Sequence, residues 1–144
     1  RLSSNDMAQL AVFAGEDANM LGTKLQNGLA ALSLVSHSAL ITATANDQDS
    51  QLIFAQQVWG IGQAGDILLA ISTSGNSQNV VLAAKTARAK NILVIGLTGS
   101  TGGRLSEVCD ISIRVPSDIV FEIQEMHLPI YHHICASVEA HFFT

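Results

Sequence analysis

Basic residues are scarce in this sequence. Its 144 residues include 7 Lys and Arg against 12 Asp and Glu, which gives a formal charge of −5. They form neither a basic block nor a basic stripe interleaved with aromatic residues, so no nucleic-acid partner is expected, because nucleic-acid binding depends on Lys and Arg that neutralise phosphates. An anionic ligand would have to be held locally, at one site.

Cysteines are also few, and long apolar runs are absent. Cys109 and Cys135 show no metal-ligand spacing and no clustered framework, which predicts a reduced, cytoplasmic protein. Gly, Ser or Thr interrupts every longer apolar stretch, so neither a membrane span nor a membrane partner is expected. The N-terminus shows no signal-peptide pattern. Its abrupt start, "RLSSND", close to a predicted helix start, indicates an incomplete N-terminus.

Charged residues make up only 13% of the sequence, whereas apolar residues make up 48%. Monomers rarely tolerate large exposed apolar patches. This composition therefore predicts that other copies of the chain cover much of the surface. The length fits one domain, residues 1–144, so we expect an oligomer of single-domain subunits.

Short aliphatic runs alternate with helical patterns along the chain. The runs predict strands at 32–36, 66–72, 91–98 and 110–115. The second and third runs are apolar on both faces, which is typical of central strands that helices cover on both sides. Helices are predicted at 5–25, 50–59, 77–89, 103–108 and 118–142. The alternation predicts an α/β fold with a parallel sheet and right-handed crossovers.

Pro129 interrupts the last helical pattern. A proline inside a helix removes an amide donor and clashes with the carbonyl four residues earlier, at a cost of roughly 3 kcal/mol. A kink is expected there.

The stretch "STSGNS", residues 72–77, is a candidate anion site. It follows a predicted strand and opens a predicted helix, and ligands of open parallel sheets bind at the carboxyl ends of the strands. The helix would direct its free amides and the positive end of its dipole at the loop. One turn or cap residue would be ordinary, but six polar or small residues in succession exceed that need. The loop matches neither a Walker loop nor a dinucleotide fingerprint.

Hydroxyl groups dominate this loop, and each can donate one further hydrogen bond. Gly75 lets the backbone approach a ligand closely. A phosphate group suits this arrangement. The predicted phosphate-binding hydroxyls are those of Ser72, Thr73, Ser74 and Ser77.

The segment from "GDILLAISTSGNS" through "IGLTGSTGG", together with "DISIRVPS" and "IQEMHLPIYHHICASVEAHF", closely resembles the sugar isomerase (SIS) family. The resemblance covers residues 31–143 well and is nearest to the sedoheptulose-7-phosphate isomerases, also called phosphoheptose isomerases, and their non-catalytic relatives. It implies a flavodoxin-like three-layer αβα sandwich with a central parallel sheet. It also implies a homotetramer whose serine-rich loop binds a sugar phosphate.

The resemblance assigns further site residues one by one. The serine-rich loop occupies the family's phosphate-contacting positions, and "TAND" brings Asp47 to the sugar hydroxyls. Gln124 and His132 match the family's glutamine and catalytic histidine in the last helix. These two and Leu128 are spaced by four, so they lie along one stripe of that helix.

The N-terminal match to the family motif "GNGGSxxDxxHFxxE" has two alignments. Without gaps, Ser3 and Asp6 are in register, while Gln9 and Phe13 stand where the histidine and the glutamate belong. A shifted alignment of "FAGE" makes Glu16 the match to the glutamate. Ser3 is accordingly expected to bind substrate and Glu16 to supply the carboxylate.

Zinc is a cofactor that the resemblance makes possible. Some members hold it with the glutamine and histidine of the last helix and two residues of the first helix. No metal ligand is assigned in this sequence, because the ungapped alignment leaves Gln9 and Phe13 at the first-helix positions.

Aldose–ketose isomerisation requires two groups that move protons. One removes a proton from carbon, and the other protonates the neighbouring oxygen as an enediol forms. Histidine suits either role near neutral pH, and a carboxylate is its usual partner. His132 and Glu16 are the expected catalytic pair.

Three functions remain open at this stage. The first is an isomerase that converts sedoheptulose 7-phosphate to D-glycero-D-manno-heptose 7-phosphate, a precursor for lipopolysaccharide or a related surface glycan. The second is a non-catalytic phosphosugar-binding or regulatory module of the kind that binds a replication initiator, favoured by Phe13 and the missing histidine. The third, an isomerase of glucosamine or arabinose phosphate, fits the "IQExH" helix less well.

Overall fold

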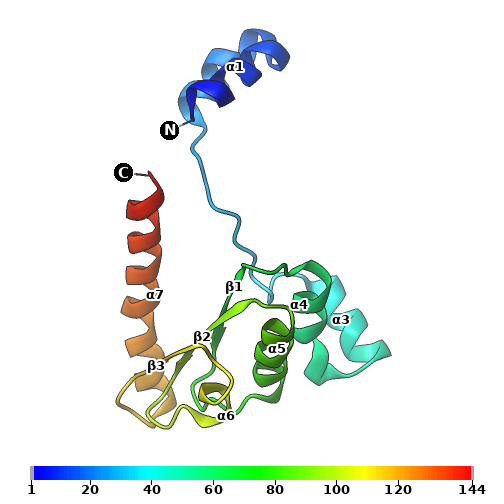
Figure 1. The fold of residues 1–144 in the computed structure, drawn as a ribbon, viewed down its shortest axis with the longest axis vertical. Coiled ribbons are helices and arrows are strands. Elements are labelled where there is room, and N and C mark those ends of the chain that lie inside the picture. The colour runs from blue at the N-terminus through cyan, green and yellow to red at the C-terminus, as the bar shows by residue number, and fades with distance from the viewer. Residues whose placement is uncertain (1, 144) are drawn as a thin grey trace. The chain divides into compact units, whose positions relative to one another are not determined.

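The computed structural model describes residues 2–143, which separate into two compact units (Figure 1). One unit contains the N-terminal segment up to Leu32 and the C-terminal segment from Ile134. The other, here called the α/β unit, runs from Ser33 to His133.

A three-stranded parallel sheet in the order β1-β2-β3 organises the α/β unit. The strands are β1 (Ile67–Ile71), β2 (Leu93–Thr98) and β3 (Ile111–Arg114). They confirm the strands predicted at 66–72, 91–98 and 110–115 to within a few residues. All three strands end at the same edge of the sheet, because they are parallel.

Helices lie on both sides of this sheet (Figure 1). α4 and α5 lie on one side, and α7 starts on the other side, so the flanked parallel sheet confirms the predicted α/β class. The helices of this unit are α3 (Ser38–Asp47), the 3-10 helix η2 (Ser50–Leu52), α4 (Ala55–Ile61), α5 (Gln78–Ala89), α6 (Gly103–Ser106) and the part of α7 (Val120–Phe143) up to His133.

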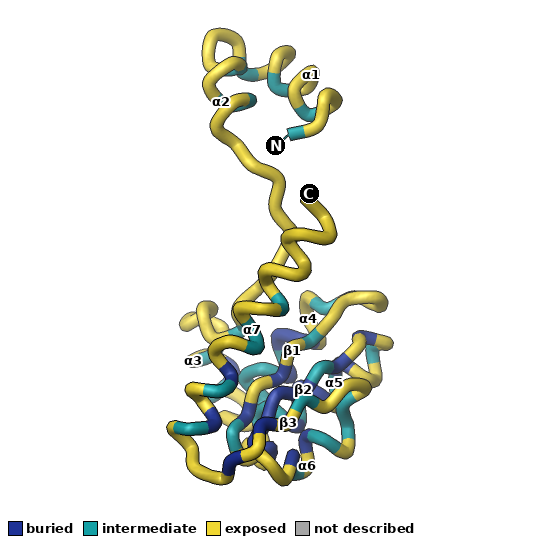
Figure 2. Tube along the Cα trace, turned by 90° about the vertical axis from the view of Figure 1, so that its left-hand side faces the viewer, coloured by how far each residue is buried: buried dark blue, intermediate teal, exposed yellow. Residues whose placement is uncertain are grey.

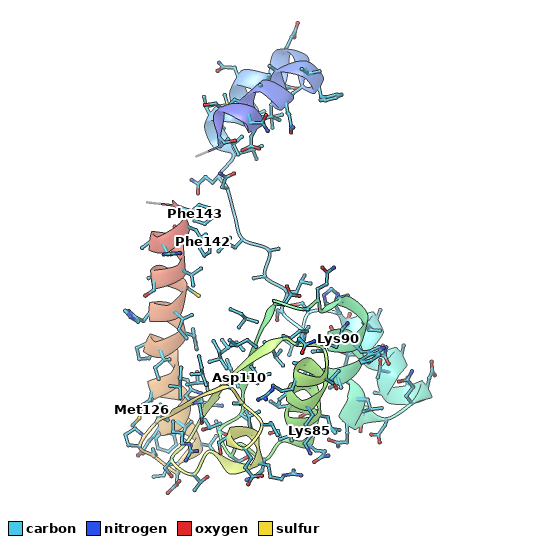
Figure 3. All side chains as sticks on the ribbon, viewed as in Figure 1. Lys85, Lys90, Asp110, Met126, Phe142 and Phe143 are labelled. Atoms are coloured by element: carbon cyan, nitrogen blue, oxygen red, sulfur yellow. The ribbon has the colours of Figure 1, made fainter. Side chains whose placement is uncertain are left out.

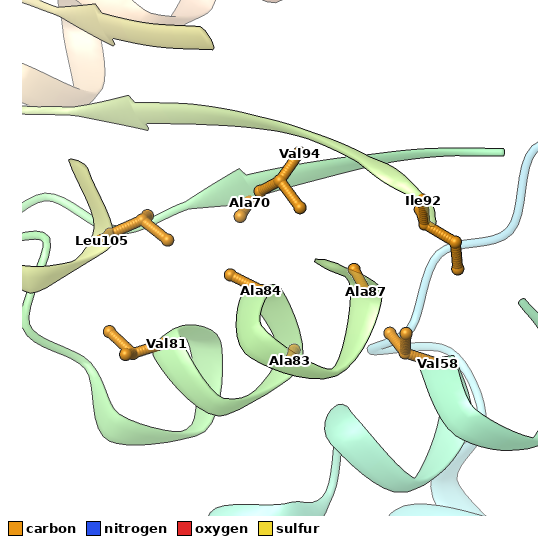
Figure 4. Close-up of a cluster of buried hydrophobic side chains, with 9 residues drawn as sticks. All are labelled: Val58, Ala70, Val81, Ala83, Ala84, Ala87, Ile92, Val94 and Leu105. Carbon is orange, nitrogen blue, oxygen red and sulfur yellow. The ribbon is translucent and has the colours of Figure 1, made fainter. Parts of the chain in front are cut away.

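The core of the α/β unit lies between α5 and the sheet (Figure 4). Ala84 and Ala87 are completely buried, and such small side chains let α5 pack closely onto Val94 of β2. Figure 2 shows that buried residues concentrate in these central elements. Lys90, at the end of α5, holds α4 in place. Its Nζ donates a 2.6 Å hydrogen bond to the Trp59 carbonyl of α4 and lies 5.4 Å from the centroid of the Trp59 ring; Figure 3 labels Lys90.

The strand predicted at 32–36 is wrong. These residues form a turn in which the Ser36 amide donates to the Ser33 carbonyl at 3.1 Å. A backbone that turns back on itself cannot present the regular row of donors and acceptors that a parallel ladder needs. The sequence reading also missed α3, and the helix predicted at 50–59 is divided into η2 and α4.

β1 is covered by helices on one face only within this chain. Leu68 and Ala70 pack into the core, whereas Ile67 and Ile71 on the other face are 64% and 44% exposed. The prediction that helices cover both faces of this strand is therefore wrong for the single chain. The sheet keeps an apolar face that is open to solvent.

The N-terminal segment forms α1 (Ser4–Phe13), the 3-10 helix η1 (Gly15–Asp17) and α2 (Ala18–Lys24). The helix predicted at 5–25 is thus interrupted, because Gly15 adopts a left-handed φ of 51° just after α1. Ser3 and Asp6 form a reciprocal capping box at the start of α1. The hydrogen bonds from the Ser3 hydroxyl and amide lower the pKa of the Asp6 carboxyl.

α7 continues without interruption through Pro129 (Figure 1). Its 24 residues make it the longest of the described helices. Among residues 2–143, none of the helices combines the length and the apolarity that crossing a membrane requires.

Candidate functional site

Three loops meet at the carboxyl edge of the sheet, as the parallel topology requires. They are residues 72–77 after β1, 99–102 after β2 and 115–119 after β3, here called the first, second and third loops. The Gly99 amide donates to the Thr73 carbonyl at 2.9 Å, and the Ser100 amide donates to the Ser117 carbonyl at 3.0 Å. The Ser100 hydroxyl also donates to the Asp118 carboxylate. The second loop therefore joins the other two.

Two glycines allow the first and second loops to interlock. Gly75 and Gly102 adopt left-handed φ values of 65° and 75°. A Cβ on Gly75 would lie 2.0 Å from the Gly102 carbonyl oxygen, so no other residue fits without moving the backbone. The Leu105 amide then donates to the Gly75 carbonyl at 2.8 Å.

The start of α5 is left open to an acceptor from outside the protein. Its N-cap residue, Ser77, makes no capping bond, because the Ser77 hydroxyl instead accepts a 3.0 Å hydrogen bond from the Ser72 hydroxyl. The amides of Gln78 and Asn79 donate to no acceptor within the described part of the chain. Free amides and the positive end of a 12-residue helix dipole together favour an anion.

A hollow of about 220 Å³ lies beside this helix start, between the three loops. This is below the roughly 300–1,000 Å³ of typical ligand pockets, so it has room for one end of a ligand. Five of its seven lining residues are polar, one of them a carboxylate, and the other two are aliphatic. The lining residues are Thr73, Ser74, Asn76, Thr101, Asp118, Val120 and Ile123.

The four predicted phosphate-binding hydroxyls form two pairs, one that lines the hollow and one next to it. Thr73 and Ser74 line the hollow. Ser72, which is buried, and Ser77 hydrogen-bond to each other next to it. The loop therefore brings all four together, although only two of them face the hollow directly.

The sugar-binding residues predicted from the resemblance are not among the residues that line the hollow. Asp47 is the last residue of α3 and is exposed. Gln124 is exposed in the second turn of α7, next to the hollow-lining Ile123. Ser3 caps α1, since its hydroxyl donates to Asp6 at 2.6 Å. Substrate binding by these three residues stays a prediction.

His132 is exposed on α7, and its ring packs edge-to-face against Tyr131 at 5.0 Å. It lies nine residues beyond Ile123, a rise of about 13 Å along the helix. α7 therefore begins at the hollow and carries His132 away from it. Glu16 is exposed in η1 of the other unit, and its pairing with His132 stays a prediction.

Zinc binding, which the resemblance makes possible, stays a prediction. In the ungapped alignment, one first-helix position is occupied by Phe13, which has no ligand atom. Among the described residues, no three His, Cys, Asp or Glu side chains gather where they could hold a metal ion. No step of the chemistry below depends on a metal.

Sequence reasoning missed Asn76, Thr101 and Asp118, which line the hollow. A signal for the second loop was present, since "GSTGG" follows β2 with the same kind of residues that follow β1. The rule that loops at the carboxyl edge converge would have joined the two loops.

His127 was also missed, because its sequence spacing matches no predicted role. Its ring is buried, and its Nε2 donates to the Thr98 carbonyl at 3.2 Å. This bond fastens α7 to the carboxyl end of β2, beside the hollow.

Replacing His127 with alanine is expected to lower the free energy of unfolding by about 2–4 kcal/mol, from the lost hydrogen bond and the cavity left behind. Urea unfolding monitored by circular dichroism measures this change. His37→Ala, at an exposed histidine, should change the same quantity by less than about 0.5 kcal/mol. Equal effects of the two substitutions would contradict the anchoring role of His127.

The fold and the loops define the class of protein: an α/β domain whose strand ends form a cradle suited to phosphate. Residues 14–99 match the family model of the SIS domain. This match covers more than half of the chain. The chain therefore belongs to the SIS domain family.

Relatives with known names agree with this assignment. The chain is 47% identical over 111 residues to the phosphoheptose isomerase of Rhodospirillum rubrum, covering 77% of this chain and 59% of that protein. It is 43% identical over 116 residues to phosphoheptose isomerase 2 of Campylobacter jejuni, covering 81% of this chain and 58% of the relative. The chain thus spans less than two thirds of the length of these relatives.

Solved structures of similar proteins share the fold. The phosphoheptose isomerase from Neisseria gonorrhoeae superposes with a TM-score of 0.75 at 35% identity, covering 93% of this chain and 70% of that one. The phosphoheptose isomerase from Francisella tularensis superposes with a TM-score of 0.72 at 40% identity, covering 83% of this chain and 68% of that one.

Proposed function

We propose that this chain belongs to a phosphosugar isomerase that converts sedoheptulose 7-phosphate to D-glycero-D-manno-heptose 7-phosphate through an enediol. The observation that carries the proposal is the open start of α5, where Ser77 leaves two helix amides free beside a hydroxyl-lined hollow. The names of the similar proteins support a heptose phosphate as the ligand.

The position of His132 is consistent with this substrate. In a 7-phosphate, the carbons that exchange a proton stand at the opposite end of the sugar from the phosphate. The distance of about 13 Å along α7 between the hollow and His132 supports a role for this histidine at that far end rather than at the phosphate. In this proposal the first loop holds the phosphate, Asp47, Gln124 and Ser3 bind the sugar, and His132 and Glu16 move the protons.

We further propose a homotetramer in the cytoplasm that supplies heptose for lipopolysaccharide or a related glycan. The exposed apolar face of the sheet supports assembly, since Ile67, Ile71 and Ile111 are each more than 40% exposed. The two free cysteines support a reducing compartment.

Incubation with a panel of ketose phosphates of five to seven carbons tests the proposed activity. Sedoheptulose 7-phosphate should be converted with the highest kcat/KM, as measured by ³¹P NMR of the sugar phosphates. Faster turnover of a five-carbon substrate would replace the assignment with an arabinose-phosphate type. Calorimetric binding of phosphosugars without turnover, with or without added zinc, would indicate the non-catalytic module instead.

A further inference from the structure

Arg104, the second residue of α6, hydrogen-bonds to the first loop and to the first residue of α5, and it is not among the residues that line the hollow. Its guanidinium donates through Nη2 to the Asn76 carbonyl and through Nη1 to the Gln78 side-chain oxygen, both at 2.8 Å. Its backbone amide donates to the Asn76 side-chain oxygen at 3.1 Å. One residue of the helix after β2 thus makes three hydrogen bonds to the segment after β1.

The two partners of Arg104 belong to different parts of the anion cradle. Asn76 lines the hollow. Gln78 is the first residue of α5, and the backbone amide of Gln78 is one of the two free amides at the start of this helix. Arg104 therefore bridges the wall of the hollow and the start of the helix. This bridge sets where the loop hydroxyls stand relative to the helix amides.

The backbone amide, the backbone carbonyl and both polar side-chain atoms of Asn76 all make hydrogen bonds in this arrangement. Its amide donates to the Ser74 hydroxyl at 3.1 Å, and its Nδ2 donates to the Ser74 carbonyl at 3.0 Å. Its two oxygens accept from Arg104. Without the guanidinium, the Asn76 carbonyl and the Gln78 side-chain oxygen would lose their partner, and only the backbone amides of α6 would still hold the turn from Ser74 to Gln78.

We propose that Arg104 is a positioning residue that holds the first loop in its anion-binding conformation. It acts through Asn76 and Gln78 rather than by touching the sugar. The proposal deepens the proposed function and rests on it for the identity of the ligand, an organic phosphate.

The shape of the side chain matters here as well as its charge. The two bonds run from two different guanidinium nitrogens to two acceptors, a fork that the single ammonium of lysine does not reproduce. Lysine would keep the positive charge near the loop and lose the bridge. Arg104→Lys therefore separates positioning from simple electrostatic attraction.

Arg88 offers a matched control at the opposite edge of the sheet. Its side chain is also exposed, and it also pairs with groups from another part of the chain. Its guanidinium lies 3.0 Å from the Asp110 carboxylate and donates to the Val108 carbonyl. Asp110 precedes β3, so Arg88→Ala removes a similar side chain far from the loops.

The test compares the Arg104→Ala, Arg104→Lys and Arg88→Ala variants of the full chain with the parent protein. Hydrogen exchange without ligand should be faster over residues 72–79 in both Arg104 variants and unchanged over 93–98. Calorimetry with inorganic phosphate should show binding weakened about tenfold in both Arg104 variants, since hydrogen bonds from a charged donor are lost but are partly exposed to water. With sedoheptulose 7-phosphate, KM should rise in the same proportion, while kcat stays within about twofold.

Equal hydrogen exchange over 72–79 in Arg104→Ala and Arg88→Ala would overturn the proposal. Parent-like phosphate affinity in Arg104→Lys would also overturn it, because charge alone would then suffice. If the parent protein turns over no sugar phosphate, the proposed function fails. Hydrogen exchange without ligand still decides the role of Arg104 in that case.

Discussion

His132→Ala is expected to lower the turnover of sedoheptulose 7-phosphate by at least about a hundredfold, the scale of general acid–base catalysis. The loss should appear in kcat, because His132 lies outside the residues that line the hollow. Binding of inorganic phosphate should be unchanged. Steady-state kinetics and calorimetry on the same preparation separate the two effects.

His141→Ala provides a matched control on the same helix. His141 is also exposed, and its ring packs against its neighbour Phe142 much as His132 packs against Tyr131. Its removal should leave turnover within about twofold of the parent value, as expected for a surface histidine without a part in proton transfer. Normal turnover in His132→Ala would remove the assignment of this histidine as acid or base.

Gly75→Ala is expected to abolish measurable phosphate binding at millimolar phosphate and to lower the free energy of unfolding by about 2–5 kcal/mol. A Cβ at this position would lie 2.0 Å from a backbone oxygen of Gly102, and the left-handed φ of 65° is itself unfavourable for alanine. The obstacle is backbone rather than a flexible side chain, so the two loops must separate. Calorimetry with phosphate and urea unfolding measure the two consequences.

Gly60→Ala is the control for this substitution. Gly60 is exposed in α4, and beyond its own stretch of helix no atom of the described chain lies within 4 Å of a Cβ placed there. Alanine should raise the free energy of unfolding at this site by about 0.4–1 kcal/mol, because it restricts the unfolded chain. Parent-like phosphate affinity in Gly75→Ala would show that the interlocked loops are not needed for the anion cradle.

Local sequence patterns were sufficient to predict the helices and strands whose formation depends on their own residues. The run 91–98 and the helical pattern 77–89 correspond closely to β2 and α5. The run at 32–36 has the same aliphatic character and forms no strand, because a strand exists only where a neighbouring backbone pairs with it. Gly15 divided the predicted N-terminal helix through a φ value that periodicity alone does not reveal.

The candidate site also depends in part on local sequence and in part on tertiary structure. The sequence by itself determined that residues 72–77 form a hydroxyl-rich loop between a buried strand and a helix, since strand ends and helix starts are signalled by neighbouring residues. Only the tertiary structure decided that Ser77 accepts from Ser72 instead of capping α5, and that Asn76, Thr101 and Asp118 share one hollow. These outcomes depend on parallel strands that place distant loops at one edge of the sheet, and on bonds such as those of Arg104 to Asn76, which lies 28 residues earlier in the chain.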